Sequence, residues 1–184
     1  MKTNESGRSM IEMLGVLAII GVLSVGGIAG YSKAMNVYRV NKTIDQLTQI
    51  TASTRALFAG HKVYTALSTG GNPNMNLIKK SHLVPDDMID GDSMVNTYGG
   101  TVLLNVANKG ERTNKAFAVS FGMIPQDSCI ELSTKEWGQG KTSGLWSVKI
   151  NSTEKLATAG NVTIAEAVAA CTSTNNNTIV WTFF

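Results

Sequence analysis

A single acidic side chain, Glu12, stands at the entrance of a long apolar segment. No side chain in the range 13–32 carries a charge, and the next ionised residue is Lys33. An unpaired carboxylate beside hydrocarbon is costly, so Glu12 should have a dedicated partner. If a peptidase cut the chain after Gly7, the new N-terminus would be a cationic amine on Arg8, about one helical turn from that carboxylate. The amine of one chain and the carboxylate of its neighbour could then neutralise each other, and this pairing would set the axial stagger between packed helices.

The elements around these groups are predicted to form one long helix over residues 9–58. The uncharged stretch would be about 30 Å long as a helix, which is enough to cross a bilayer core. It is longer than the apolar part of an ordinary signal peptide, and the helical pattern continues beyond it. Apolar residues with one weaker member recur at steps of three and four at Val37, Val40, Ile44, Leu47, Ile50, Thr54 and Leu57. We therefore expect an apolar half at 9–32 and a one-sided half at 33–58 that packs on the chain's own globular domain.

The order of these features resembles the prepilin motif of type IV pilins: Gly7, four further residues, Glu12 and then an apolar helix. The segment SMIEMLGVLAIIGVLSVGGIAGYSKAM is similar in sequence to the N-terminal region of type IVb pilins of plasmid and pathogenicity-island pilus systems. The resemblance implies that residues 1–7 are a leader removed between Gly7 and Arg8 by a membrane aspartyl peptidase, which also methylates the Arg8 amine. It further implies that Glu12 recruits the subunit to a growing filament. Arg8 departs from the family pattern, which usually has Phe or Met at this position.

Five glycines lie in the apolar half of the predicted helix, although glycine weakens a helix interior by up to about 1 kcal/mol relative to alanine. In lipid the helix must keep its hydrogen bonds, so this weakness would be masked there. In a crowded filament the same residues would allow close helix packing or local unwinding. We take Gly21, Gly26 and Gly27 as the extensible segment. The alternative is that small residues here serve packing alone.

The chain has two cysteines, Cys129 and Cys171, both beyond the apolar segment. A helix near the N-terminus that displays the rest of the chain outside implies an oxidising compartment, where such a pair becomes a disulfide. A redox or metal-binding pair would be expected to show CxxC spacing or a nearby histidine, and neither is present. The resemblance agrees, because type IV pilins commonly carry one disulfide in the C-terminal region.

Residues 59–184 are predicted to form a globular head of class α+β. Strands are expected at 101–106, 116–121, 145–150 and 178–183, with a hairpin turn at 108–110. Short helices are expected near 76–82, at Cys129 with Asp127 or Ser128 as its cap, and after a capping box at 163–166 that leads to Cys171. A long helix on a roughly four-stranded antiparallel sheet with a C-terminal disulfide region matches the type IV pilin fold.

Several motifs of enzymes and binding proteins are incomplete in this sequence. The segment Gly138-Gln139-Gly140-Lys141-Thr142 ends like a phosphate-binding loop, but Lys135 stands where the first glycine is needed. Four aspartates around Gly91 lack the closing glutamate of a calcium loop, so a solvated turn is expected. Neither histidine has a second ligand at metal spacing, and no serine lies in a nucleophile elbow. The net charge of +3 is too small to indicate nucleic-acid binding. We expect no enzyme activity, no cofactor and no metal.

Together these features predict the major subunit of a type IV pilus. The prepilin would reside in the bacterial inner membrane, be processed by prepilin peptidase and polymerise with itself through the assembly machinery. The resulting extracellular filament would serve adhesion to host-cell surfaces, aggregation or conjugation with recipient cells. Three alternatives remain: a minor pilin or adhesin, a secretion-system pseudopilin, and an unprocessed protein that keeps residues 1–7 as part of a signal anchor.

Overall fold

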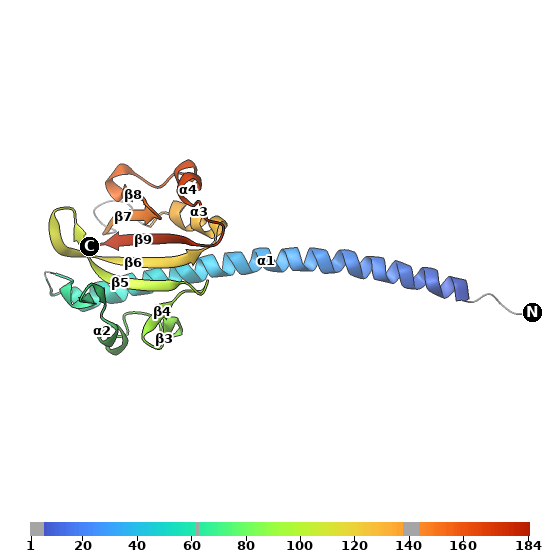
Figure 1. Cartoon of the computed structure of the whole chain (residues 1–184), viewed down its shortest axis with the longest axis horizontal. Helices are drawn as coiled ribbons and strands as arrows, with labels where there is room; N and C mark the ends of the chain where they lie inside the picture. Colours follow the sequence, from blue (N-terminus) through green and yellow to red (C-terminus); the bar gives the residue numbers. More distant parts are fainter. Residues whose placement is uncertain (1–5, 62, 138–143) are drawn as a thin grey trace, which may run out of the picture. The chain divides into compact units, whose positions relative to one another are not determined.

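The computed structural model describes residues 6–61, 63–137 and 144–184, with only the backbone described for 6–9. The chain divides into two units, Met1–Tyr38 and Arg39–Phe184. Helix α1 (Ser6–Phe58) runs through both, so the predicted long helix is confirmed, beginning three residues before the expected start at residue 9. The second unit contains the sheet, the remaining helices and the last part of α1 (Figure 1).

The head is built on a seven-stranded sheet with the order β3-β4-β5-β6-β9-β7-β8, in which all neighbouring strands are antiparallel. The four predicted strands are its central members: β5 (Thr101–Lys109), β6 (Arg112–Ile124), β7 (Leu145–Ile150) and β9 (Asn177–Phe183). The expected number of strands was too low, because β3 (Ile89–Asp90), β4 (Ser93–Val95) and β8 (Thr153–Leu156) add short edges. Runs this short carry little periodic signal.

Strand β9 lies between β6 and β7, although it follows every other strand along the chain (Figure 1). Its residues alternate strictly between buried and partly buried positions, as expected for a strand with one face in the core. Trp181 is fully buried, and its ring meets that of Phe121 on β6 edge to face, with 5.8 Å between the ring centroids. The aromatic residues of this strand therefore form the centre of the head's core.

The hairpin between β5 and β6 turns at Gly110, which has a positive φ of 59°. The predicted hairpin is thus confirmed, but its turn lies at 110–111, because Asn108 and Lys109 belong to β5. Strand β6 extends three residues past its predicted end by means of an irregularity between Phe121 and Ile124. Met123 has a φ of 55° there, a conformation that is uncommon for residues other than glycine.

Short elements cover the part of the edge of β5 that the short strand β4 leaves unpaired. The helical turn η1 (Thr65–Leu67) leads into the two-stranded sheet of β1 (Ser68–Thr69) and β2 (Asn72–Pro73), followed by α2 (Met75–Lys80). The backbone N–H of Val106 donates to Ser68 Oγ at 2.9 Å, so this segment satisfies part of the open strand edge. A further turn, η2 (Asp86–Met88), precedes β3.

The part of α1 inside the head is one-sided, as the apolar stripe predicts, but two positions differ. Val40, Leu47 and Ile50 are buried, whereas Val37 and Leu57 are 47% and 40% exposed, and Phe58 is buried in place of Leu57. The buried face also includes polar residues that the stripe did not contain, namely Thr43, Gln46 and Thr51.

Candidate functional site

The groups that the prepilin motif brings together lie in the first turns of α1. Gly7 and Arg8 belong to the helix, and only their backbone is described. Residues 1–5 are outside the described part of the chain. Glu12 lies further along the same helix and is exposed. The structure thus places the proposed cleavage site and the acidic residue on one helix. Cleavage, methylation and intersubunit pairing remain predictions.

Every residue from Met10 to Ala34 is exposed. The exposed residues include large apolar side chains on all sides of the helix. Leu17, Val22 and Ile28, for example, are 61%, 75% and 69% exposed. By length and composition the helix could cross a membrane, although a signal sequence near an N-terminus would meet the same criterion. A continuous exposed apolar surface of this kind is a site where lipid or another protein binds.

The polar groups within this apolar helix are satisfied by the helix itself. Ser24 Oγ donates to the carbonyl of Ile20 at 2.7 Å, and Ser32 Oγ donates to the carbonyl of Ile28 at 3.0 Å. The backbone is continuous α-helix through the predicted extensible segment at 21–27. A methyl group added at Gly21, Gly26 or Gly27 would meet no atom of the chain within 4 Å, so folding of the single chain does not require these glycines. Their role in a filament stays a prediction.

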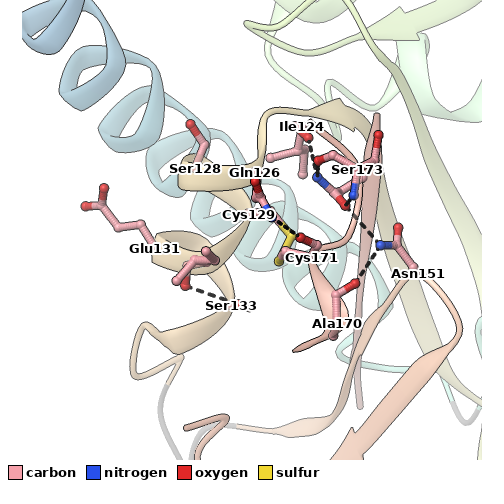
Figure 2. Close-up of a disulfide and its surroundings, with 12 residues drawn as sticks. Ile124, Gln126, Ser128, Cys129, Glu131, Ser133, Asn151, Ala170, Cys171 and Ser173 are labelled. Atoms are coloured by element: carbon pink, nitrogen blue, oxygen red, sulfur yellow. Dashed lines mark hydrogen bonds between the residues drawn. A yellow bond between two sulfur atoms is a disulfide. The ribbon is translucent and has the colours of Figure 1, made fainter. Parts of the chain in front are cut away.

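Cys129 and Cys171 form the predicted disulfide, with their Cα atoms 6.0 Å apart. The bond joins α3 (Gln126–Thr134) to the residue that ends α4 (Ile164–Ala170), so it connects helix to helix as expected (Figure 2). The predicted cap of α3 was wrong: Pro125 holds that position, and no side chain caps the helix. Proline suits a helix start because it has no backbone N–H to satisfy.

Two asparagines that the sequence analysis did not single out bind the chain around this disulfide. Asn177 Nδ2 donates to the carbonyls of Ile124 and Ser173. Asn151 Nδ2 donates to the carbonyl of Ala170 beside the disulfide (Figure 2). Asn177 is fully buried. In a chain rich in asparagine, no local pattern distinguishes these two from the many exposed ones.

The capping box at the start of α4 is present as predicted, with Thr163 as its cap and Glu166 closing it. Lys155 on β8 donates to Glu166 Oε2 at 2.6 Å, and the backbone N–H of Thr163 donates to the same oxygen at 2.8 Å. Hydrogen bonds from Lys155 and then Thr163 favour the ionised form, and they lower the pKa of Glu166 to about 2.

Two of the four aspartates around Gly91 form ion pairs with lysines. Lys42 on α1 pairs with Asp87 at 2.6 Å, and Lys79 pairs with Asp92 at 2.8 Å. Across the described ranges, no three metal-ligating side chains converge on one point. The phosphate-loop-like segment 138–142 falls outside the described residues.

Comparison with known proteins assigns most of the chain to one protein family. The family model described as "PilS N terminal" matches residues 37–184. Over 195 aligned positions, the chain is 24% identical to the major structural subunit of bundle-forming pilus from Escherichia coli O111:H-, covering all of this chain and 95% of the relative. The corresponding subunit of the Escherichia coli O127:H6 strain matches with the same identity and coverage.

Solved structures share the fold. The type IVb pilin of Salmonella typhi superimposes with a TM-score of 0.55 and 23% identity, covering 74% of this chain and 96% of that one. TcpA, a type IV pilin from Vibrio cholerae El Tor, gives a TM-score of 0.55 and 14% identity over 80% of this chain and 99% of its own. The long helix, the antiparallel sheet and the C-terminal disulfide thus form a type IV pilin fold, and the chain belongs to the PilS family of type IVb pilins.

Proposed function

We propose that this chain is the major structural subunit of a type IVb pilus and polymerises through α1. The observation that carries the proposal is the apolar surface of residues 10–34, which is exposed on all sides and has a single acid, Glu12, at its start. The names of the Escherichia coli relatives as major pilus subunits support it. The pilus would lie outside the cell and serve adhesion, aggregation or conjugation.

In the proposed mechanism the prepilin waits in the inner membrane until prepilin peptidase cuts between Gly7 and Arg8 and methylates the Arg8 amine. Lipid tails are as apolar as the leucines of the helix, so transfer from lipid to a helix bundle gains little from hydrophobicity alone. A buried acidic side chain costs about 2.5–3.5 kcal/mol on insertion scales. Pairing of Glu12 with the Arg8 amine of a neighbouring subunit would remove that cost only in the correct axial register.

The test replaces Glu12 with alanine in the full-length prepilin. We expect normal cleavage and a folded head but a loss of at least about tenfold in filament, because the register-setting charge is gone. The intact mass of sheared protein reports cleavage, methylation and the disulfide together. The matched control is Asp45→Ala, which removes an exposed acid from the head part of the same helix. Normal filaments from the Glu12 variant would refute the pairing.

We further propose that the segment 21–27 gives the filament its extensibility. Replacing Gly21, Gly26 and Gly27 with alanine should favour the helix by up to about 1 kcal/mol at each position. Filaments of the triple variant should therefore need a higher force to lengthen in a single-filament pulling experiment. Gly15→Ala, near the start of the apolar segment, serves as the control. Equal force–extension curves would leave packing as the role of the three glycines.

A further inference from the structure

Strand β8 forms one end of the seven-stranded sheet (Figure 1). It pairs with β7 on one side, from Thr153 opposite Ile150 to Leu156 opposite Ser147. Among the residues that the structure describes, the backbone groups of β8 have no further backbone partner. About half of the N–H and C=O groups of an edge strand point away from its neighbour. This edge of the sheet can therefore accept a further strand.

A groove of about 400 Å³ runs along β8 and separates it from α4. All four residues of β8 line the groove, although successive side chains of a strand point to opposite faces, so the groove follows the strand backbone. Glu166 and Ala170 on α4 form the opposite wall. Clefts that bind ligands typically measure about 300–1,000 Å³, so this groove is large enough for side chains of a bound peptide.

The floor of the groove is aliphatic. Val148 and Ile150 on β7 and Val162 before α4 line it, and they are 6%, 3% and 8% exposed. On the neighbouring strand β9, Ile179 and Trp181 are completely buried. Solvent thus reaches the hydrophobic core of the head at the groove. Aliphatic side chains of another chain would remove this apolar surface from water.

An ion pair joins the two walls of the groove. Lys155 Nζ on β8 lies 2.6 Å from Glu166 Oε2 on α4. The disulfide at Cys171 holds the other end of α4. The walls are thus fixed in place before a ligand binds, and a preorganised site reduces the entropic cost of binding. Because the two charges neutralise each other, the groove favours apolar side chains over charged ones.

The charges of β8 select which strand can be added. Glu154 and Lys155 point to opposite faces of the sheet, and antiparallel pairing places residues of the same face opposite each other. Two copies of β8 would bring Glu154 against Glu154 or Lys155 against Lys155, and like charges directly opposite are destabilising. A second copy of β8 is thereby disfavoured. A strand with a basic side chain opposite Glu154 is favoured by the same rule.

We propose that β8 and the groove bind an extended peptide segment of a partner protein, which adds a strand to the sheet. The segment carries aliphatic side chains at alternate positions, which enter the groove, and basic side chains between them, which face Glu154. In this mode main-chain hydrogen bonds supply affinity, and pockets for alternate side chains supply specificity. The site lies in the head and is independent of the proposed polymerisation through α1, so unassembled protein serves for the test.

The experiment titrates the peptide acetyl-Lys-Val-Lys-Val-Lys-amide into the full-length chain, labelled with nitrogen-15 and kept in a nonionic detergent. Nuclear magnetic resonance follows the backbone amide signals. Those of residues 148–156 and 162–170 should shift in a saturable way, with a Kd on the order of 0.1 mM for a ligand of this length. The peptide acetyl-Lys-Lys-Val-Val-Lys-amide has the same composition without the alternation and should bind at least about fivefold more weakly.

Two methylated peptides test the added strand itself. In the extended peptide the amides of the valines point to one edge and those of the lysines to the other. Methylation of the amide nitrogens that face β8 should weaken binding at least about tenfold, because main-chain hydrogen bonds are lost. Methylation of the other set should change the affinity by less than about threefold, because those groups face solvent.

Two variants test the groove and the charge. Ala159 is exposed and lines the groove, so Ala159→Glu should weaken binding about tenfold by placing a charge there. Its control is Thr158→Glu, next to it and outside the lining. Glu154→Lys should weaken binding about fivefold and should favour a peptide with glutamate in place of lysine. Glu111→Lys, in the exposed hairpin turn, is the second control.

Four results would overturn the assignment. The first is the absence of saturable shifts in β8 up to about 5 mM peptide. The second is equal binding of the two methylated peptides, which would show that side chains enter the groove without an added strand. The third is unchanged affinity in Ala159→Glu, which would place the binding elsewhere. The fourth is a shift of the β8 signals with the concentration of the chain alone, which would identify a second copy as the occupant.

Discussion

Residues 10–34 and 39–58 of α1 share one continuous helical backbone but differ in what their side chains contact. In the first region every residue is exposed and Leu17 is 61% exposed, whereas in the second Leu47 is only 1% exposed. All five glycines of α1 beyond the proposed cleavage site lie in the first region and none in the second. The apolar residues of the second region therefore stabilise the head, and those of the first remain available to lipid or to other subunits.

The most direct test of this difference between the two regions of α1 is to make the same substitution in each. Leu47→Ala should lower the free energy of unfolding of the head by about 2–5 kcal/mol, because it leaves a cavity in the core. Leu17→Ala should change it by less than about 0.5 kcal/mol. Near-UV circular dichroism of the detergent-solubilised full chain during denaturant unfolding measures both values.

Filament yield should separate the same variants in the other direction. If Leu17 packs against neighbouring subunits, Leu17→Ala should reduce assembly while the head stays as stable as before. A large loss of head stability from Leu17→Ala would show that the two regions are not distinct.

The disulfide extends the comparison from a region held by packing to one held by a covalent bond. Its loop has a sequence separation of 42, for which the chain-entropy model gives about 4 kcal/mol, and measured values often fall between about 2 and 4 kcal/mol. Replacing both Cys129 and Cys171 with alanine should therefore lower the stability of the head by an amount in that range. Reduction of the unmodified chain with dithiothreitol is the parallel measurement. A negligible loss would mean that the contacts of Asn151 and Asn177 suffice.

The smallest effect concerns the surface pair of Lys155 and Glu166. Because the folded pKa of Glu166 is about 2 and the ordinary value is 4.5, its stabilising contribution is complete above about pH 4.5 and is lost as the pH falls towards 2. Glu166→Gln keeps the capping box but removes the charge. Melting temperatures of the two proteins should differ near neutral pH and converge in acid.

Glu111→Gln, in the exposed hairpin turn, is the control for that measurement. A difference between the unmodified chain and Glu166→Gln that stays constant down to about pH 2 would show that the charge of Glu166 does not stabilise the fold.

The features of the fold that the sequence predicted are those with a strong pattern of residue types. The helix, the four central strands, the capping box at Thr163 and the disulfide all follow from periodicity or residue chemistry. The short strands β3, β4 and β8 were missed because two to four residues carry almost no periodic signal. The extension of β6 through Gly122 was also missed, since glycine favours the end of a strand.

The polar sites of the head lay beyond what the sequence could indicate. Asn151 contacts Asn177 across 26 residues of sequence, and Asn177 contacts Ile124 across 53, so only the folded chain reveals these contacts. The sequence motif and the family match complement each other: the prepilin motif lies near the N-terminus, and the matched region begins at residue 37.

The central place of β9 has a consequence for the order in which the head can fold. Its neighbours β6 and β7 both precede it along the chain, so each presents an unpaired edge until residues 177–183 have emerged. Unpaired edges are templates for association with other chains. A head that folds as the chain emerges would therefore pass through an aggregation-prone stage just before completion, when a chaperone that shields strand edges would have the most effect.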